Sequence, residues 1–169
     1  MRRKLQILVI GYNGDSCTKE AYDIAYQVGK EVAKKGAVLL TGGLGGVMEA
    51  ACKGASESKG IAIGVIPFED FADANQYCNI VICTGIGFAR DFITAYSTDG
   101  VVIVGGGIGT LIEAGAAYMK KKPIVAILGS GGTADEYAGK YLDERKRVKI
   151  LSAKTATEAM HIILKSVAT

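Results

Sequence analysis

Three glycine-rich segments are the part of this chain whose residue types and spacing could bind a ligand. They are Gly11-Tyr12-Asn13-Gly14-Asp15-Ser16, Thr41-Gly42-Gly43-Leu44-Gly45-Gly46 and Gly105-Gly106-Gly107-Ile108-Gly109-Thr110. Glycines let the backbone approach a ligand closely, and a helix N-terminus presents unpaired N–H groups with partial positive charge. We therefore predict a site for a small phosphate-bearing ligand. The residues expected to contact it are Gly11, Gly14, Gly42, Gly43, Gly45, Gly46, Gly106, Gly107, Gly109 and Thr110.

A simpler interpretation is that these glycines only form tight turns between a strand and a helix. Two separate segments with four glycines each favour binding over that interpretation, since one or two glycines suffice for a turn. The common phosphate motifs are absent. No G-x-x-x-x-G-K-[ST] occurs, and G-x-G-x-x-G is broken by Met48 in one segment and by Thr110 in another. The sequence therefore disfavours a P-loop nucleotidase and a standard dinucleotide oxidoreductase.

Glu113 and Arg90 are the charged residues that could act on a bound ligand. Thr110 and Glu113 have the spacing of a capping box, so Glu113 could simply accept from the backbone N–H of Thr110. Alternatively, its carboxylate could stabilise a developing ribosyl cation, and in the first turn of a helix we expect it to be ionised at neutral pH. Arg90 could be a solvated cation paired with Asp91, or it could grip a ribose phosphate or pair with Glu113.

The elements that would position these residues alternate between short aliphatic strands and helices. We expect strands at residues 5–10, 38–40, 61–65, 80–83, 101–104, 124–128 and 148–151. We expect helices at residues 18–35, 47–58, 88–97 and 111–121, a last helix that begins at 155–156, and a flexible loop at 129–134. Consecutive apolar positions are typical of parallel strands that helices cover on both faces. The predicted fold class is α/β, a Rossmann-like, doubly wound, mostly parallel sheet with helices on both faces.

Size and composition predict one domain over residues 1–169. Hydrophobic residues make up 49% and charged residues 22% of the chain, which excludes disorder. The net charge of +3 is too small to favour a nucleic-acid partner, and the basic cluster at 144–149 is typical of a solvated face. No apolar run approaches the ~20 residues of a membrane span, so we expect no membrane partner and a cytoplasmic protein.

The cysteines and the single histidine predict no metal site. Cys17, Cys52, Cys78 and Cys83 form no C-x-x-C pair, and His161 lies far from them in the sequence. We expect reduced thiols, with Cys52 and Cys83 buried as small apolar side chains.

The segment from Gly106 to Glu113 resembles the P-G-G-x-G-T-x-x-E signature of the Lonely Guy-type proteins, a superfamily long labelled possible lysine decarboxylases. Residues 41–55 resemble its G-G-x-x-G-x-M segment, and Arg90 occupies the place of its motif arginine. Gly105 replaces the proline of the signature, and Asp91 replaces the lysine that usually follows the arginine. Residues 11–15 and 129–132 make the chain most similar to the subgroup of molybdenum-cofactor carrier proteins.

The resemblance implies a dimer that binds a nucleotide or a molybdopterin-type cofactor and requires no other cofactor. Three functions stay open: a carrier that does not turn its ligand over, a nucleoside 5′-monophosphate phosphoribohydrolase with Arg90 and Glu113 as catalytic residues, and an interaction module. Asp91 removes a cation and favours the carrier. A pyridoxal-phosphate decarboxylase is disfavoured, because no lysine lies in the glycine segments. Small residues at 114–117 would permit close helix packing in a homodimer.

Overall fold

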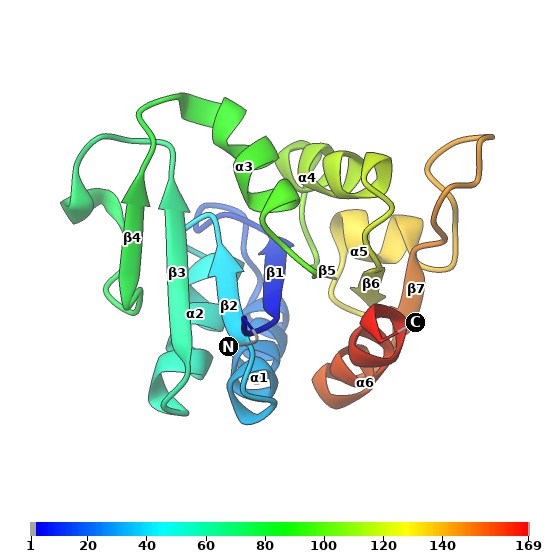
Figure 1. Cartoon of the computed structure of the whole chain (residues 1–169), viewed down its shortest axis with the longest axis horizontal. Coiled ribbons are helices and arrows are strands. Elements are labelled where there is room, and N and C mark those ends of the chain that lie inside the picture. The colour runs from blue at the N-terminus through cyan, green and yellow to red at the C-terminus, as the bar shows by residue number, and fades with distance from the viewer. Residues whose placement is uncertain (1–2, 169) are drawn as a thin grey trace.

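Seven parallel strands form one sheet, in the order β4-β3-β2-β1-β5-β6-β7 (Figure 1). The computed structural model describes residues 3–168, so the first two residues and the last residue of the predicted domain lie outside the described part. The strands are β1 (Gln6–Gly11), β2 (Val38–Thr41), β3 (Ile61–Ile66), β4 (Ile80–Cys83), β5 (Gly100–Val104), β6 (Ile124–Ile127) and β7 (Leu151–Ala153). The α-helices are α1 (Lys19–Lys34), α2 (Val47–Glu57), α3 (Arg90–Tyr96), α4 (Ile108–Met119), α5 (Gly132–Tyr137) and α6 (Ala156–Val167).

The order of the strands reverses between β1 and β5. The chain steps outward from β1 through β2 and β3 to β4, then returns to the other side of β1 and continues through β6 to β7. In an open parallel sheet, ligands bind at the carboxyl ends of the strands on either side of such a reversal. Gly11 at the end of β1 is in register with Val104 at the end of β5, so the first and third glycine segments begin side by side.

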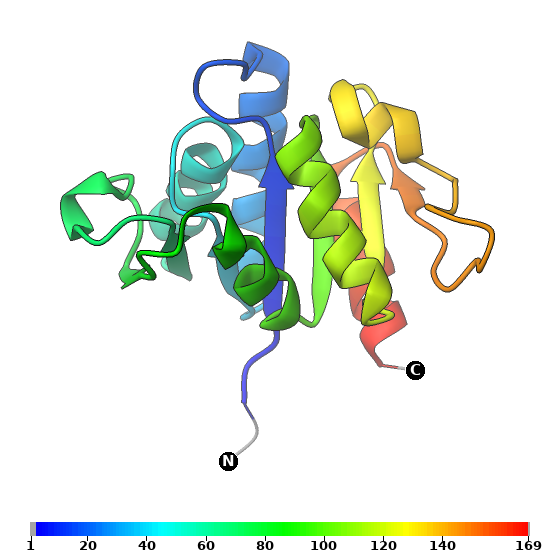
Figure 2. The ribbon, with the colours of Figure 1, turned by 90° about the horizontal axis from the view of Figure 1, so that it is seen from above.

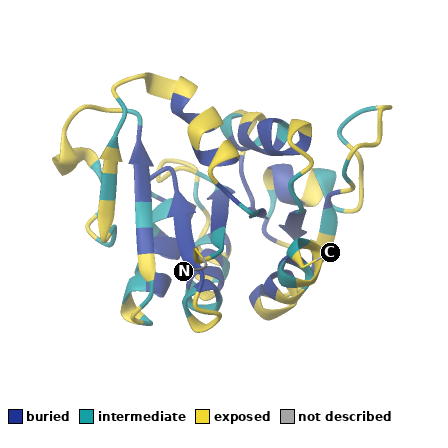
Figure 3. Cartoon of the chain, viewed as in Figure 1, coloured by how far each residue is buried: buried dark blue, intermediate teal, exposed yellow. Residues whose placement is uncertain are grey.

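Helices cover both faces of the sheet, and each face has its own apolar core. Ile7 and Val9 of β1 pack with α1, α2 and α6, whereas Leu8 and Ile10 point to the opposite face and pack with α4 and α5. This division follows from the alternation of side chains along a strand. Seen from above, α3 and α4 lie side by side over the second face (Figure 2). The strands in the centre of the sheet are buried along their length (Figure 3). The predicted doubly wound α/β fold is confirmed.

Two elements on the C-terminal side of the sheet differ from the prediction, in addition to the start of α4, which is described with the site below. The seventh strand is Leu151–Ala153, further along the chain than predicted. The segment predicted as a flexible loop at 129–134 is held in place, and its last residues, from Gly132, form the start of α5. The Asp135 carboxylate accepts from the N–H groups of Gly129 (2.7 Å) and Gly131 (3.0 Å), and the N–H of Thr133 donates to the carbonyl of Gly106 (2.9 Å).

The four cysteines are not joined by disulfides in the described chain. Cys52 is fully buried on α2. Cys83 is only half-buried, which corrects the expectation that it packs inside the core, because its strand β4 forms an edge of the sheet. Among residues 3–168, every helix is too short or too polar to cross a lipid bilayer.

Candidate ligand-binding site

Helix α4 begins at the reversal point without a side-chain cap. Its N-cap residue is Gly107, which has no side chain to offer, and the carbonyl of Gly107 accepts from the N–H of Leu111 (3.1 Å). In an α-helix the N–H groups before that bond have no partner within the helix. In the described part of the chain, nothing accepts from the N–H groups of Ile108, Gly109 and Thr110. This turn therefore presents free donors and the positive end of the helix dipole.

The helix starts earlier than the sequence predicts, and this excludes the capping box at Glu113. With Ile108 as the first residue of α4, Glu113 lies in the second turn, beyond reach of the orphan N–H groups. The hydroxyl of Thr110 instead donates to the carbonyl of Gly11 (3.0 Å). Thr110 thereby ties the start of α4 to the end of β1.

Most of the predicted glycines serve close packing between the segments. A Cβ atom on Gly11 would lie 2.0 Å from the carbonyl oxygen of Val104, and one on Gly46 would lie 2.5 Å from that of Tyr12. These contacts leave no room for a side chain at either position. The remaining glycines with a close neighbour are Gly42 (against Arg90), Gly43 (against Ile66) and Gly106 (against Thr110).

Gly107 and Gly109 face open space. A Cβ atom on either residue would meet no atom within 4 Å, apart from the chain neighbours. Gly14 and Gly45 pack against each other in ordinary contact, where the first and second segments meet. Of the predicted glycines, Gly107 and Gly109 at the start of α4 are therefore the ones whose small size leaves free volume for a ligand.

Arg90, the first residue of α3, is buried, so the interpretation of a solvated cation is wrong. Its side chain pairs with Asp91, its Nη1 atom lies 3.8 Å from Oε1 of Glu113, and its Nη2 atom donates to the carbonyl of Gly42 (3.3 Å). Only 7% of the residue is exposed. The buried Nε atom has no hydrogen-bond partner among the described residues. Arg90 thus keeps one N–H group for a further acceptor.

Burial of Glu113 raises its pKa to about 7, which corrects the expectation of a fully ionised carboxylate. The hydroxyl of Thr94 donates to Oε1 of Glu113 (2.7 Å). This hydrogen bond and the charge of Arg90 lower the pKa of Glu113, but they offset only part of the increase that burial causes. The Asp91 charge raises it further. Burial also raises the pKa of Asp91, against the charge of Arg90. At neutral pH Glu113 can therefore exchange a proton.

The charged residues and the start of α4 line a common cavity of about 120 Å³. Its lining is Gly11, Asn13, Leu44, Met48, Phe88, Arg90, Asp91, Gly109, Thr110 and Glu113. A second cavity, of about 270 Å³, lies on the α5 side of the same helical turn. Its lining is Gly106, Gly107, Ile108, Leu111, Gly132, Thr133, Glu136 and Tyr137. The first turn of α4 separates the two cavities and contributes to both.

Several lining residues were missed by reasoning from the sequence. Phe88 at the cavity mouth is 86% exposed, an unusual setting for a phenylalanine, yet no sequence pattern marks it. Met48 follows the second segment, and only its place as the methionine of the family motif could have marked it as a site residue. Thr94 lies behind the lining, where it donates to Glu113, and its position one helical turn after Arg90 could have suggested that both side chains share a face of α3.

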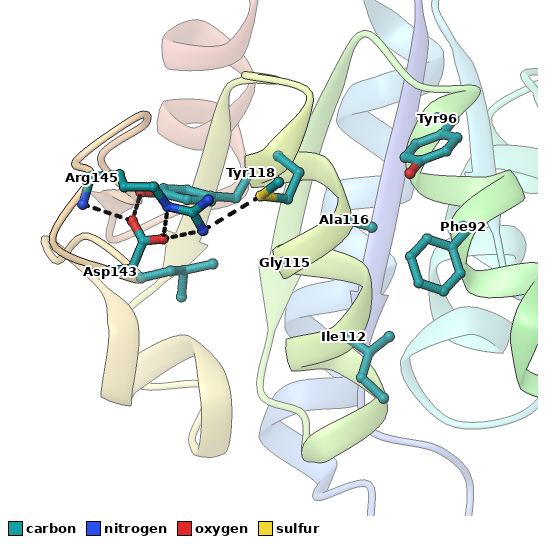
Figure 4. Close-up of a pocket in the computed structure, with 10 residues that line it drawn as sticks. Phe92, Tyr96, Ile112, Gly115, Ala116, Tyr118, Asp143 and Arg145 are labelled. Atoms are coloured by element: carbon teal, nitrogen blue, oxygen red, sulfur yellow. Dashed lines mark hydrogen bonds and ion pairs between the residues drawn. The ribbon is translucent and has the colours of Figure 1, made fainter.

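A larger cavity, of about 520 Å³, lies on the outer face of α4 and contains none of the predicted site residues (Figure 4). Phe92 and Tyr96 of α3 line one side of it, and an ion pair between Asp143 and Arg145 lines the other. Its walls are mainly apolar, and no helix begins there. We therefore place the candidate ligand site at the start of α4 and not in this groove.

The small residues at 114–117 do not form one packing face. Ala114 and Ala117 belong to the core on this side of the sheet, Gly115 lines the outer groove, and Ala116 does both, since it is buried in that core and also borders the groove. Figure 4 shows Gly115 and Ala116 at the groove. With 3.6 residues per turn, four consecutive side chains are distributed round most of the helix, so they cannot all share one face. Any contact with a second copy would depend instead on the larger apolar side chains beside them.

Three solved structures are similar to this chain over almost its whole length. TM1055 is 38% identical with a TM-score of 0.89, covering 95% of this chain and 99% of that chain. The molybdenum cofactor binding protein of the phototrophic bacterium Rippkaea orientalis is 31% identical with a TM-score of 0.86, covering 100% of both chains. The molybdenum cofactor carrier protein of Chlamydomonas reinhardtii is 34% identical with a TM-score of 0.82, covering 99% of this chain and 100% of that chain.

These likenesses confirm the resemblance to Lonely Guy-type proteins and, among them, to molybdenum-cofactor carriers. The solved structures share the fold of this chain, including its doubly wound sheet. The model of one family matches residues 4–165 of the sequence. The chain belongs to the SLOG cluster4 family.

Proposed function

We propose that this protein binds the molybdenum cofactor, or a closely related phosphorylated pterin, and carries it without chemical turnover. The observation that carries this proposal is the uncapped N-terminus of α4, which opens toward a cavity that also contains Arg90 with its unpartnered Nε–H. A phosphate group there would accept from the N–H groups of Ile108 and Gly109. The helix dipole favours such an anion.

The charge of the cavity fits a phosphate that binds together with a proton. Arg90 supplies one positive charge, but Asp91 and Glu113 lie beside it. An incoming phosphate would disfavour the ionised form of Glu113, whose pKa is already about 7. We therefore expect Glu113 to be protonated when the ligand is bound.

The ring of the ligand has room on the α5 side of the same turn. Ile108, Leu111 and Tyr137 give the cavity of about 270 Å³ apolar and aromatic walls, which suit a flat heterocycle. A ligand whose phosphate contacts the start of α4 can extend into this cavity. Glu136 at its edge offers a carboxylate acceptor for ring N–H groups.

The alternative is a phosphoribohydrolase, for which Glu113 would move a proton near Arg90. A carboxyl group with a pKa of about 7 is suited to that task. Two observations favour the carrier. Asp91 engages the guanidinium group that would otherwise grip ribose phosphate, and two of the similar structures are described as molybdenum-cofactor binding or carrier proteins.

The test compares two variants of one residue, Gly109→Asp and Gly109→Asn. Both side chains enter open space and have almost the same shape, so both variants should fold. The aspartate would also suit a helix N-terminus, but it would repel a phosphate. We expect Gly109→Asp to bind inorganic phosphate and AMP at least about 10-fold more weakly than Gly109→Asn, a difference of about 1.4 kcal/mol.

Binding is followed through the amide NMR signals of residues 105–110, and free adenine is assayed in the same samples. Equal binding by the two variants would contradict the phosphate site. Release of adenine by the wild-type protein, lost in Glu113→Ala, would replace the carrier with the hydrolase.

A further inference from the structure

Two cysteines from distant parts of the sequence meet behind the second glycine segment. Cys52 lies on α2 and Cys78 lies just before β4, and their Sγ atoms are 3.8 Å apart. Gly64 of β3 makes this meeting possible, because a Cβ atom there would lie 2.6 Å from Sγ of Cys78. Neither thiol lines the candidate ligand site.

Cys52 is linked to the glycine segment through Thr41. The Oγ1 atom of Thr41 lies 3.3 Å from Sγ of Cys52 and accepts from the N–H of Gly43 (3.0 Å). Any rotation of the Cys52 side chain toward Cys78 therefore removes a contact that supports the turn at Gly43.

Cys78 is linked to the same segment through Asn75. The backbone N–H of Asn75 donates to the carbonyl of Gly43 (2.8 Å), and its side-chain amide donates to the carbonyl of Leu44 (3.0 Å). The N–H of Cys78 in turn donates to the carbonyl of Asn75 (3.3 Å). The two thiols thus contact the two groups that hold the segment at 42–46 in place.

We propose that Cys52 and Cys78 form a reversible disulfide that responds to the surrounding thiol–disulfide balance and alters the glycine segment at 42–46. The sulfurs must approach from 3.8 Å to about 2.05 Å, which rotation of the two side chains and a small shift of the backbone at 75–78 can supply. The disulfide would join α2 to the segment at 75–78, whose Asn75 donates to the carbonyls of Gly43 and Leu44.

The reaction is a thiol–disulfide exchange with a small disulfide such as oxidised glutathione. Cys78 is half-buried and Cys52 fully buried, so the small disulfide reaches Cys78 first. The Cys78 thiolate attacks one sulfur of the reagent, a mixed disulfide forms, and one small thiolate leaves. Cys52 then attacks Sγ of Cys78 and expels the second small thiolate.

The products balance: the protein dithiol and one small disulfide give one protein disulfide and two small thiols, which take up the two protons. In the dithiol, the hydrogen bond from Cys78 lowers the pKa of Cys52. That bond is lost in the mixed disulfide, and Thr41 and Asn75, which also lower this pKa, then remain to support the Cys52 thiolate in the closing attack. The same bond and burial raise the pKa of Cys78, so the first step should quicken as the pH rises.

The experiment treats the folded protein at about pH 8 with excess oxidised glutathione and then counts free thiols and maps peptides by mass spectrometry. We expect the free thiols to fall from four to two per chain, with one Cys52–Cys78 link and a mass lower by two hydrogen atoms. Dithiothreitol should restore all four. The amide NMR signals of residues 42–46 should shift between the two forms.

Matched controls come from the other two cysteines. Cys17→Ser and Cys83→Ser should still form the link, whereas Cys52→Ser and Cys78→Ser should not. Four free thiols after treatment, or a glutathione adduct at Cys78 without closure, would overturn the proposal, and so would a link that leaves residues 42–46 unchanged. Phosphate binding is measured separately on the reduced protein, so its failure would leave this result intact.

Discussion

Glu113 is a carboxyl group whose surroundings favour the protonated form. It lies next to Asp91 in a buried position, and the Thr94 hydroxyl and the more distant Arg90 do not offset the loss of water. An ionisable group in this state makes the stability of the fold depend on pH. This makes Glu113 the residue where the geometry of the site can be tested without a ligand.

The test is the substitution Glu113→Gln, which keeps the shape and removes the charge. The folded pKa of about 7 lies above the ordinary value of 4.5, so the stabilising contribution of Glu113 is complete below about pH 4.5 and is lost as the pH rises through 7. We expect the wild-type protein to lose on the order of 3 kcal/mol relative to Glu113→Gln over this range.

Urea unfolding at several pH values between 4.5 and 8 measures this difference. Asp91 is present in both proteins, so the part of its contribution that does not depend on the charge of Glu113 cancels. A difference between the two proteins that stays constant with pH would show that the Glu113 carboxyl is solvated.

The glycine segments, which we predict to contact the ligand, also allow neighbouring elements to pack closely. At Gly46 the backbone has φ of +66°. Its Cα lies so close to the carbonyl of Tyr12 that an added Cβ atom would be 2.5 Å from the carbonyl oxygen. The next residue, Val47, donates its N–H to that same carbonyl (2.9 Å). The start of α2 is thereby attached to the end of β1.

We expect Gly46→Ala to destabilise the protein by roughly 1–3 kcal/mol, because a side chain at this φ is strained and would clash with Tyr12. Gly14→Ala on the facing segment is the control, since its new Cβ atom would make only ordinary contacts, the nearest at 3.6 Å. The midpoint of urea unfolding measures both. Equal stability of the two variants would mean that the first and second segments do not pack as described.

The outer face of α3 and α4 is the part of the whole molecule that suits a second copy. Its exposed apolar side chains are Phe92, Tyr96, Ile112 and Met119, each between 43% and 48% exposed. Apolar side chains gathered in this way are typical of contact surfaces, and symmetric dimers are the commonest oligomers. We keep the homodimer as a prediction and place its contact on this face.

Sedimentation at micromolar concentration tests this prediction. We expect the wild-type protein to be a dimer and Ile112→Asp to weaken the dimer at least about 10-fold, since a buried unpaired charge is costly. Ile80→Asp is the control, because Ile80 is comparably exposed on the edge strand β4, away from α4. A wild-type monomer, or equal effects of the two variants, would contradict the contact.

The sequence by itself determined the architecture and pointed to the place of the candidate ligand site. Runs of apolar residues fix the strands, and the glycine segments follow strands whose carboxyl ends a parallel sheet brings to one edge. These are local patterns, and the pattern of each element lies within its own stretch of sequence. The strands β1 and β5 are therefore predictable together with the segments that leave them.

Only the tertiary structure decided the electrostatics of that site. Burial of Arg90, Asp91 and Glu113 depends on how α3 packs on α4, and Thr94 reaches Glu113 only through that contact. The start of α4 at Ile108 and the placement of residues 129–134, which lead into α5, likewise depend on hydrogen bonds between distant segments. Burial and capping are properties of neighbours in space, which spacing along the chain does not encode.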